Sequence, residues 1–140
     1  MTIEVPLKGF TEEAIANLEK LIASKAALIQ KAIGAEALWV LRTETTLQFP
    51  WFPSGLEGDV VSSYVQFIYA LCTVAKQQKR VTAKEKPVDN EKFAFRVFLI
   101  RLGFVGDDYK AARKILLKNL SGNSAFRNGV PGKQEVEADE

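Results

Sequence analysis

The side chains whose type and spacing point most directly to a ligand are cations near the carboxyl-terminal end of the chain. Four of them recur at helical spacing, and a fifth follows a Ser-Gly-Asn-Ser segment. Cations, hydroxyls and amides are the groups that contact phosphate in protein–DNA complexes. The candidate nucleic-acid-binding residues, with DNA as the first-choice partner, are therefore Lys110, Arg113, Lys114, Lys118 and Arg127.

Two predicted helices position these cations. Asn90 caps the first helix and Gly103 ends it, and Gly106 or Asp107 starts the second after a turn of three or four residues. The apolar stripe of the first helix is expected to be Phe93, Val97, Ile100 and Phe104, broadened by Ala94, Phe98 and Leu102. The second helix keeps Tyr109, Ala112, Leu116 and Leu120 on the face away from the cations. This spacing matches a DNA-reading helix-turn-helix.

A plain αα-hairpin fits the same pattern. Lys110, Lys114 and Lys118 lie four residues apart, which is how any amphipathic helix solvates its outer face. Cations near the end of a helix also suit its negative dipole. DNA binding and a structural or protein-binding hairpin therefore both remain open at this point.

Catalytic and metal-binding residue types are scarce. Histidine is absent, and Cys72 is the single cysteine. This removes the commonest general base, the Ser-His and Cys-His nucleophile pairs and every ordinary zinc site. The acidic pairs at 12–13 and 107–108 fall where predicted helices begin, where carboxylates cap backbone N–H groups. We expect no metal, no cofactor and no enzymatic activity, and a buried Cys72.

An aromatic cluster at residues 49–53 offers a second kind of interaction surface. Leu47, Phe49 and Trp51 share one face of a predicted strand, whereas Phe52 departs from that alternation and is expected to be exposed. Tryptophan and phenylalanine are enriched at protein interfaces. Trp51 and Phe52 are therefore the candidate patch for a protein-interaction module, the alternative being a strand end that plugs the core.

Length and composition describe one globular unit. The chain has 140 residues, of which 47% are hydrophobic and 26% charged. We assign residues 1–130 to a single α+β domain and residues 131–140 to a flexible acidic tail. No apolar run reaches the roughly 18 residues of a membrane span. The first residues lack the pattern of a signal peptide, so a cytoplasmic location is expected.

Charge is distributed unevenly along the chain. Residues 1–59 hold five Lys/Arg and eight Asp/Glu, for −3, whereas residues 60–133 hold fourteen against five, for +9. Residues 134–140 add −4, and the net charge is +2. Such polarity favours an anionic partner for the basic region.

Periodicity predicts the elements that precede the cationic helix. A strand with Pro6 at a sheet edge comes first, followed by one long helix from the cap Thr11 to the stop Gly34. A hairpin with arms 38–41 and 46–51 is expected next. An apolar helix that can start at Asp59 should then lie at the centre of the core. The predicted fold is α+β: a three-stranded β-α-β-β sheet packed by a long helix, followed by an all-helical carboxyl-terminal half.

Four segments carry a family likeness: residues 49–52, 90–97, 101–114 and 117–126. In them the chain resembles small "virulence-related" proteins encoded on integrative conjugative elements, or conjugative transposons, of Gram-positive gut bacteria. The resemblance extends over most of the chain. It implies an accessory protein of a mobile genetic element, with DNA, a protein of that element or a host protein as partner. It transfers no catalytic residue.

Overall fold

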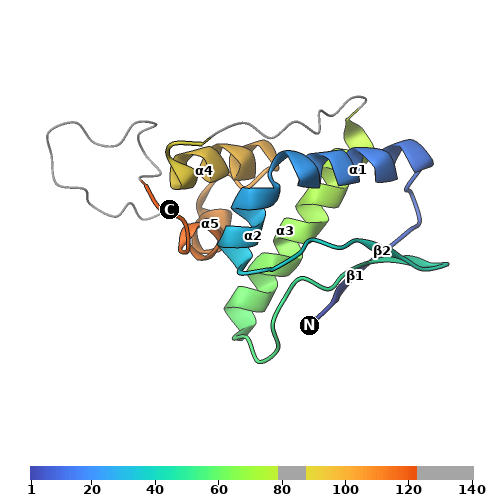
Figure 1. Cartoon of the computed structure of the whole chain (residues 1–140), viewed down its shortest axis with the longest axis horizontal. Helices are drawn as coiled ribbons and strands as arrows, with labels where there is room; N and C mark the ends of the chain where they lie inside the picture. Colours follow the sequence, from blue (N-terminus) through green and yellow to red (C-terminus); the bar gives the residue numbers. More distant parts are fainter. Residues whose placement is uncertain (79–87, 123–140) are drawn as a thin grey trace, which may run out of the picture.

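The computed structural model describes residues 1–78 and 88–122. Its elements are β1 (Ile3–Pro6), α1 (Glu12–Ser24), α2 (Ala26–Ile33), β2 (Leu41–Arg42), β3 (Thr46–Phe49), α3 (Gly58–Gln77), α4 (Glu91–Arg101), the 3-10 turn η1 (Asp107–Tyr109) and α5 (Lys110–Leu117). The three strands form an antiparallel sheet in the order β1-β3-β2 (Figure 1). The predicted α+β fold, with a helical carboxyl-terminal part, is confirmed.

The sheet buries one of its two faces. Ile3 pairs with Phe49 and Val5 with Leu47, and these four side chains lie in the core. The intervening residues of β1 are exposed and those of β3 are half-buried. Pro6 lies on the edge strand β1, where a residue without an N–H donor is tolerated, so its predicted position is confirmed.

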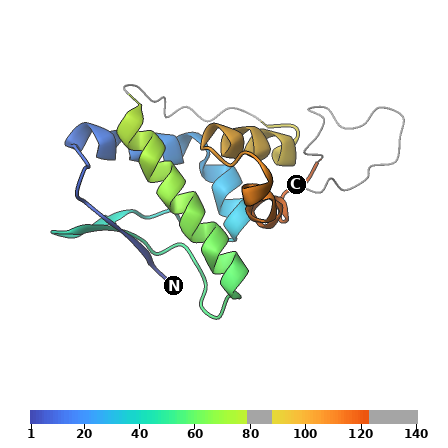
Figure 2. The ribbon, with the colours of Figure 1, turned by 180° about the vertical axis from the view of Figure 1, so that it is seen from behind.

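Helix α3 is the centre of the fold. Figure 2 shows it running diagonally between the sheet and the α4–α5 pair, and it contacts β1, α1 and α5. Its buried residues are Ser63, Tyr64, Phe67, Ile68, Leu71, Cys72 and Ala75. Among the described helices it is the one long and apolar enough to cross a membrane, judged by length and composition only. A core helix that packs on several neighbours has the same composition.

The single long helix predicted from Thr11 to Gly34 is wrong in one respect, because it breaks at Lys25. The Ser24 hydroxyl donates to the Leu21 carbonyl at 2.8 Å, and the Lys25 N–H bonds back to Ile22 at 3.1 Å. This tight turn closes α1 and redirects α2. The break lets α1 pack on α3 while α2 packs on α5, which one straight helix would not do.

The helix ends otherwise follow local hydrogen-bond chemistry. Thr11 accepts from the Ala14 N–H at 3.0 Å, and Asn90 accepts from the Phe93 N–H at 3.1 Å, as predicted caps should. Gly34 ends α2 with φ +72°, a conformation that favours glycine.

The predicted apolar stripe of α4 is correct only in part: Phe98, Leu102 and Phe104 are buried as expected. The helix buries Phe95, Phe98 and Leu99, whereas Ile100 is exposed and Phe93 only half-buried. Apolar residues occur on all sides of this short helix, so periodicity alone does not determine its orientation.

Candidate functional site

One edge of the sheet is β2 (Leu41–Arg42), and we call β2 together with the preceding residues 38–40 the edge arm. Leu41 pairs with β3, and the Thr43 N–H donates to a β3 carbonyl at 2.8 Å. Because hydrogen bonds alternate along an antiparallel strand, Leu41 and Thr43 turn their backbone groups toward β3, and Arg42 turns its groups away. Within the described part of the chain, the backbone of Val40 has no hydrogen-bond partner. The edge arm therefore presents main-chain donors and acceptors to solvent.

Two apolar side chains of the edge arm face outward. Trp39 is 68% exposed and Leu41 is 48% exposed, and Trp39 has the largest exposed fraction among the large hydrophobic residues described. Leu38 and Val40 point the other way and pack against the core. Since only one face of the sheet is covered, an arm with four consecutive apolar residues leaves two of them outside.

A groove of about 420 Å³ lies beside the edge arm. It is lined by Glu19, Ile22, Ala23, Ala26, Leu38, Trp39 and Val40. The lining therefore comes from the end of α1, the start of α2 and the edge arm, and among the described residues its one charged side chain is Glu19. An apolar cleft with a few placed polar groups is the usual form of a ligand or peptide site.

The edge arm is anchored by a buried indole. Trp51 Nε1 donates to the Trp39 carbonyl at 2.7 Å, which holds the backbone of residue 39 against the sheet. Trp51 is 4% exposed and packs edge-to-face on Phe49, with ring centroids 5.3 Å apart. The main chain at position 39 is thus fixed while its side chain remains in solvent.

The predicted exposure of Phe52 is wrong, whereas Trp51 is buried on the side of Leu47 and Phe49, as the alternation predicted. Phe52 is 5% exposed and stacks on Tyr64 of α3, with ring centroids 4.8 Å apart. The strand ends at Phe49, so the alternation that placed Phe52 outside no longer applies at residue 52. Both rings plug the core, and the exposed aromatic surface lies instead at Trp39.

Sequence reasoning missed Trp39, Leu41 and Glu19 as site residues. A usable signal was present for the first two, because Leu38-Trp39-Val40-Leu41 is apolar at every position of a strand in a sheet covered on one face. No comparable signal marks Glu19, which reaches the groove only through the packing of α1 beside the edge arm.

The predicted cationic set divides into three groups. Lys110, Lys114 and Lys118 are all exposed and lie four residues apart, and we call them the lysine row. Within residues 1–78 and 88–122 the lysine row makes no salt bridge. Arg113 instead turns back into the fold, where its guanidinium donates to the carbonyls of Phe104 and Gly106, both at 3.0 Å. Arg127 lies outside the described residues, as does the predicted tail 131–140.

The helix pair departs from the predicted helix-turn-helix. The second helical segment starts at the predicted Asp107, where η1 begins and continues directly into α5, but residues 102–106 separate it from α4, whereas a turn of three or four residues was expected. Asp107 and Asp108 are exposed at the start of α5. In a DNA-reading pair the start of the second helix approaches the major groove. Two carboxylates at that point oppose insertion, so the lysine row suits phosphate contact better than base reading.

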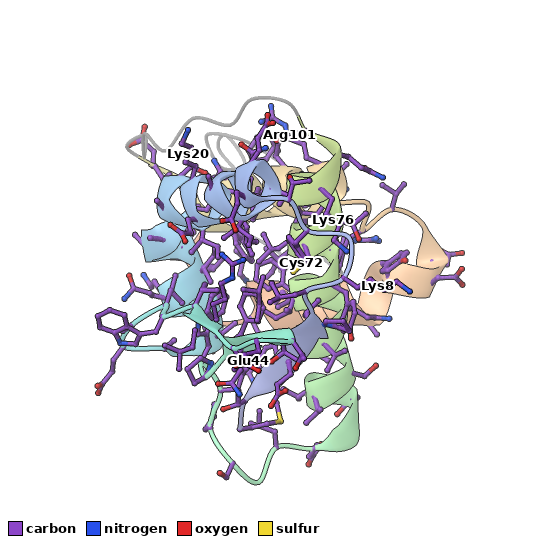
Figure 3. The ribbon with its side chains drawn as sticks, turned by 90° about the vertical axis from the view of Figure 1, so that its right-hand side faces the viewer. Lys8, Lys20, Glu44, Cys72, Lys76 and Arg101 are labelled. Atoms are coloured by element: carbon purple, nitrogen blue, oxygen red, sulfur yellow. The ribbon has the colours of Figure 1, made fainter. Side chains whose placement is uncertain are left out.

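Two of the described carboxylates, Glu12 and Glu91, form ion pairs that link separate elements of the fold. None of these residues forms a group of three or more His, Cys, Asp or Glu that could hold a metal ion. Cys72 lies near the centre of the molecule (Figure 3), and burial raises the pKa of its thiol to about 12. A hydrogen bond from Arg42 lowers the pKa of Glu12, and one from Lys31 lowers that of Glu91.

No family model, curated protein or solved structure matches this chain. Its function must therefore be argued from its own surfaces. Two of them stand out: the edge arm with its groove, which is apolar, and the lysine row, which is cationic.

Proposed function

We propose that this protein is a non-enzymatic accessory factor that binds another protein through the edge arm and the adjoining groove. The observation that carries the proposal is the 68% exposure of Trp39 in continuity with Leu41 and an apolar groove. Tryptophan is among the residues most enriched in interface hot spots. Single exposed apolar residues are ordinary, but a contiguous apolar surface marks an interaction site.

The resemblance to proteins of integrative conjugative elements supports the same role. An accessory factor of a mobile element has a partner either among the proteins of that element or in the host. A binding role also suits a chain without histidine and with a single, buried cysteine.

Site-directed photo-crosslinking tests this proposal. Benzoylphenylalanine placed at Leu41 is expected to give a discrete covalent adduct in cells that express the protein from its own gene. The same probe at Val105, which is 61% exposed on the turn after α4, is the matched control and is expected to give none. Trp39→Ala combined with the probe at position 41 should remove the adduct. Equal labelling at positions 41 and 105 would count against a specific surface.

Phosphate binding by the lysine row is a second candidate function. The observation that favours it is the alignment of three exposed lysines, without a carboxylate partner among the described residues, on one side of α5. DNA is the first-choice partner, and contact to its backbone would position the protein without reading sequence. The two functions use different elements, so separate variants distinguish them.

A further inference from the structure

We infer that the edge arm accepts an extended, cationic segment of the partner protein as a fourth strand of the sheet, next to β2. This inference rests on the proposed protein-binding function and specifies the chemistry of its ligand. Three features of the described residues carry it: the open backbone of the edge arm, the groove beside it and the charge of that groove.

The backbone of the edge arm provides the pairing groups. Arg42 directs its N–H and C=O groups away from β3, and β2 ends the sheet on that side. The backbone of Val40, just before β2, has no hydrogen-bond partner among the described residues. An extended peptide adds to such an edge through main-chain hydrogen bonds, which supply affinity independently of its sequence. The bond from Trp51 Nε1 to the Trp39 carbonyl holds the backbone of residue 39 in place before the peptide arrives, which reduces the entropy lost on binding.

The groove provides the selectivity. Side chains of an added strand alternate between the two faces of the sheet. Those on the covered face would enter the groove between the edge arm and Ile22, Ala23 and Ala26. Those on the open face would lie beside Trp39 and Leu41, the two exposed apolar side chains of the edge arm. An apolar side chain therefore fits both faces of the incoming strand.

The negative charge of the groove favours a Lys or Arg among the side chains of the added strand that enter it. Glu19 is the one charged residue of the lining within residues 1–78 and 88–122, and residues 1–59 carry −3 in total. Arg42 would oppose a cation, but its guanidinium already makes two hydrogen bonds to the Glu12 carboxylate, at 2.8 and 3.0 Å. A Lys or Arg two residues from the apolar anchor would lie on the same face of the added strand, toward Glu19.

A defined probe tests the inference directly. It is a blocked peptide of about eight residues, built from valine and threonine with one central lysine, and its counterpart carries glutamate in place of lysine. The lysine peptide is expected to bind several-fold more tightly than the glutamate peptide. Because a partly exposed ion pair contributes modestly, Glu19→Lys should weaken lysine-peptide binding by about fivefold and improve glutamate-peptide binding. Glu57→Lys, the same charge change outside the groove lining, is the matched control.

Amide hydrogen exchange reports the added strand itself. The lysine peptide is expected to slow exchange of the Val40 and Arg42 N–H groups at least tenfold, with no comparable change at exposed amides of α5. Val40→Pro removes one of these donors at a sheet edge, where proline is tolerated, and should abolish binding while Trp51 stays buried. If that variant does not fold, amide exchange of the unchanged chain with and without the lysine peptide still shows whether the peptide pairs with the edge arm.

Several results would overturn the inference. Peptide binding without protection at Val40 and Arg42 would mean that side chains alone are recognised. Equal affinity for the lysine and glutamate peptides would show that Glu19 does not select a cationic side chain. Concentration-dependent protection of the edge arm without peptide would assign the edge to a second copy of this chain. If the crosslink at position 41 forms and no peptide binds, the proposed protein-binding function stands and the strand-addition inference fails; if neither occurs, both fail.

Discussion

Truncation of the two tryptophans is expected to lower the free energy of unfolding by very different amounts. A buried aromatic side chain removes about 150–250 Å² from water, at roughly 25 cal/mol per Å². Trp51 is 4% exposed, so Trp51→Ala should lower the free energy of unfolding by about 4 kcal/mol, within the range for such truncations in cores. It also removes the donor to the Trp39 carbonyl.

Trp39→Ala is expected to lower the free energy of unfolding much less than Trp51→Ala. With 68% of Trp39 exposed, roughly 80 Å² of its surface is covered, which sets an upper limit of about 2 kcal/mol. Unfolded chains already hide part of their apolar surface, and alanine retains the first carbon of the side chain. The expected loss is therefore about 1 kcal/mol.

Urea denaturation followed by far-ultraviolet circular dichroism measures both losses without depending on the fluorophore that is removed. The crosslinking assay supplies the other half of the comparison, because Trp39→Ala should abolish the adduct at position 41 in a protein that remains folded. A loss of stability for Trp39→Ala equal to that for Trp51→Ala would refute the reasoning, since it would show that the Trp39 indole belongs to the core.

Three further predictions concern the carboxyl-terminal helices. Arg113→Ala should lower the free energy of unfolding, measured by urea denaturation, by about 1–2 kcal/mol, because it removes two charge-assisted hydrogen bonds to the turn before α5. Unchanged stability together with weaker DNA binding would return Arg113 to the candidate nucleic-acid-binding residues. Hydrogen bonds from Lys31 and Ser121 lower the folded pKa of Glu91, so the stability that Glu91 contributes is present above its unfolded pKa, near 4.5, and is lost as pH falls through the folded value. Glu91→Gln should therefore reduce the loss of unfolding free energy between neutral and acidic pH, measured by urea denaturation. An unchanged pH dependence of the unfolding free energy would contradict this role of Glu91. Replacing the lysine row by alanine should lower the slope of log affinity for duplex DNA against log salt concentration by nearly one per lysine. The control is the triple alanine variant of Lys8, Lys20 and Arg101, which lie on other elements (Figure 3) and should change this slope much less. An equal change of slope in both variants, or no DNA binding at low salt, would argue against a specific phosphate site.

The parts of the fold that follow from neighbouring residues could be predicted. The caps at Thr11 and Asn90 depend on side chains that bond within one helical turn, and the stop at Gly34 depends on one glycine. The break at Lys25 could not be predicted in this way. No proline or glycine marks it, and its advantage is that α1 and α2 reach different partners.

The predicted sites show the same limit. Arg113 and Lys114 are adjacent cations in the sequence, yet one is bonded to backbone carbonyls and the other is exposed. Phe52 follows a strand and by alternation should leave its buried face, but the strand ends at Phe49 and the ring stacks on Tyr64. Both outcomes depend on where distant segments lie.

The sequence by itself determined that this chain forms amphipathic strands and helices in an α+β order, because period and capping are local properties. It also determined the chemistry at hand: cations near the end, acids near the start and no histidine. Only the tertiary structure decided which apolar surfaces remain uncovered. Trp39 and Trp51 lie on arms of the same hairpin, but the helices cover one face of the sheet, so one indole joins the core and the other faces solvent.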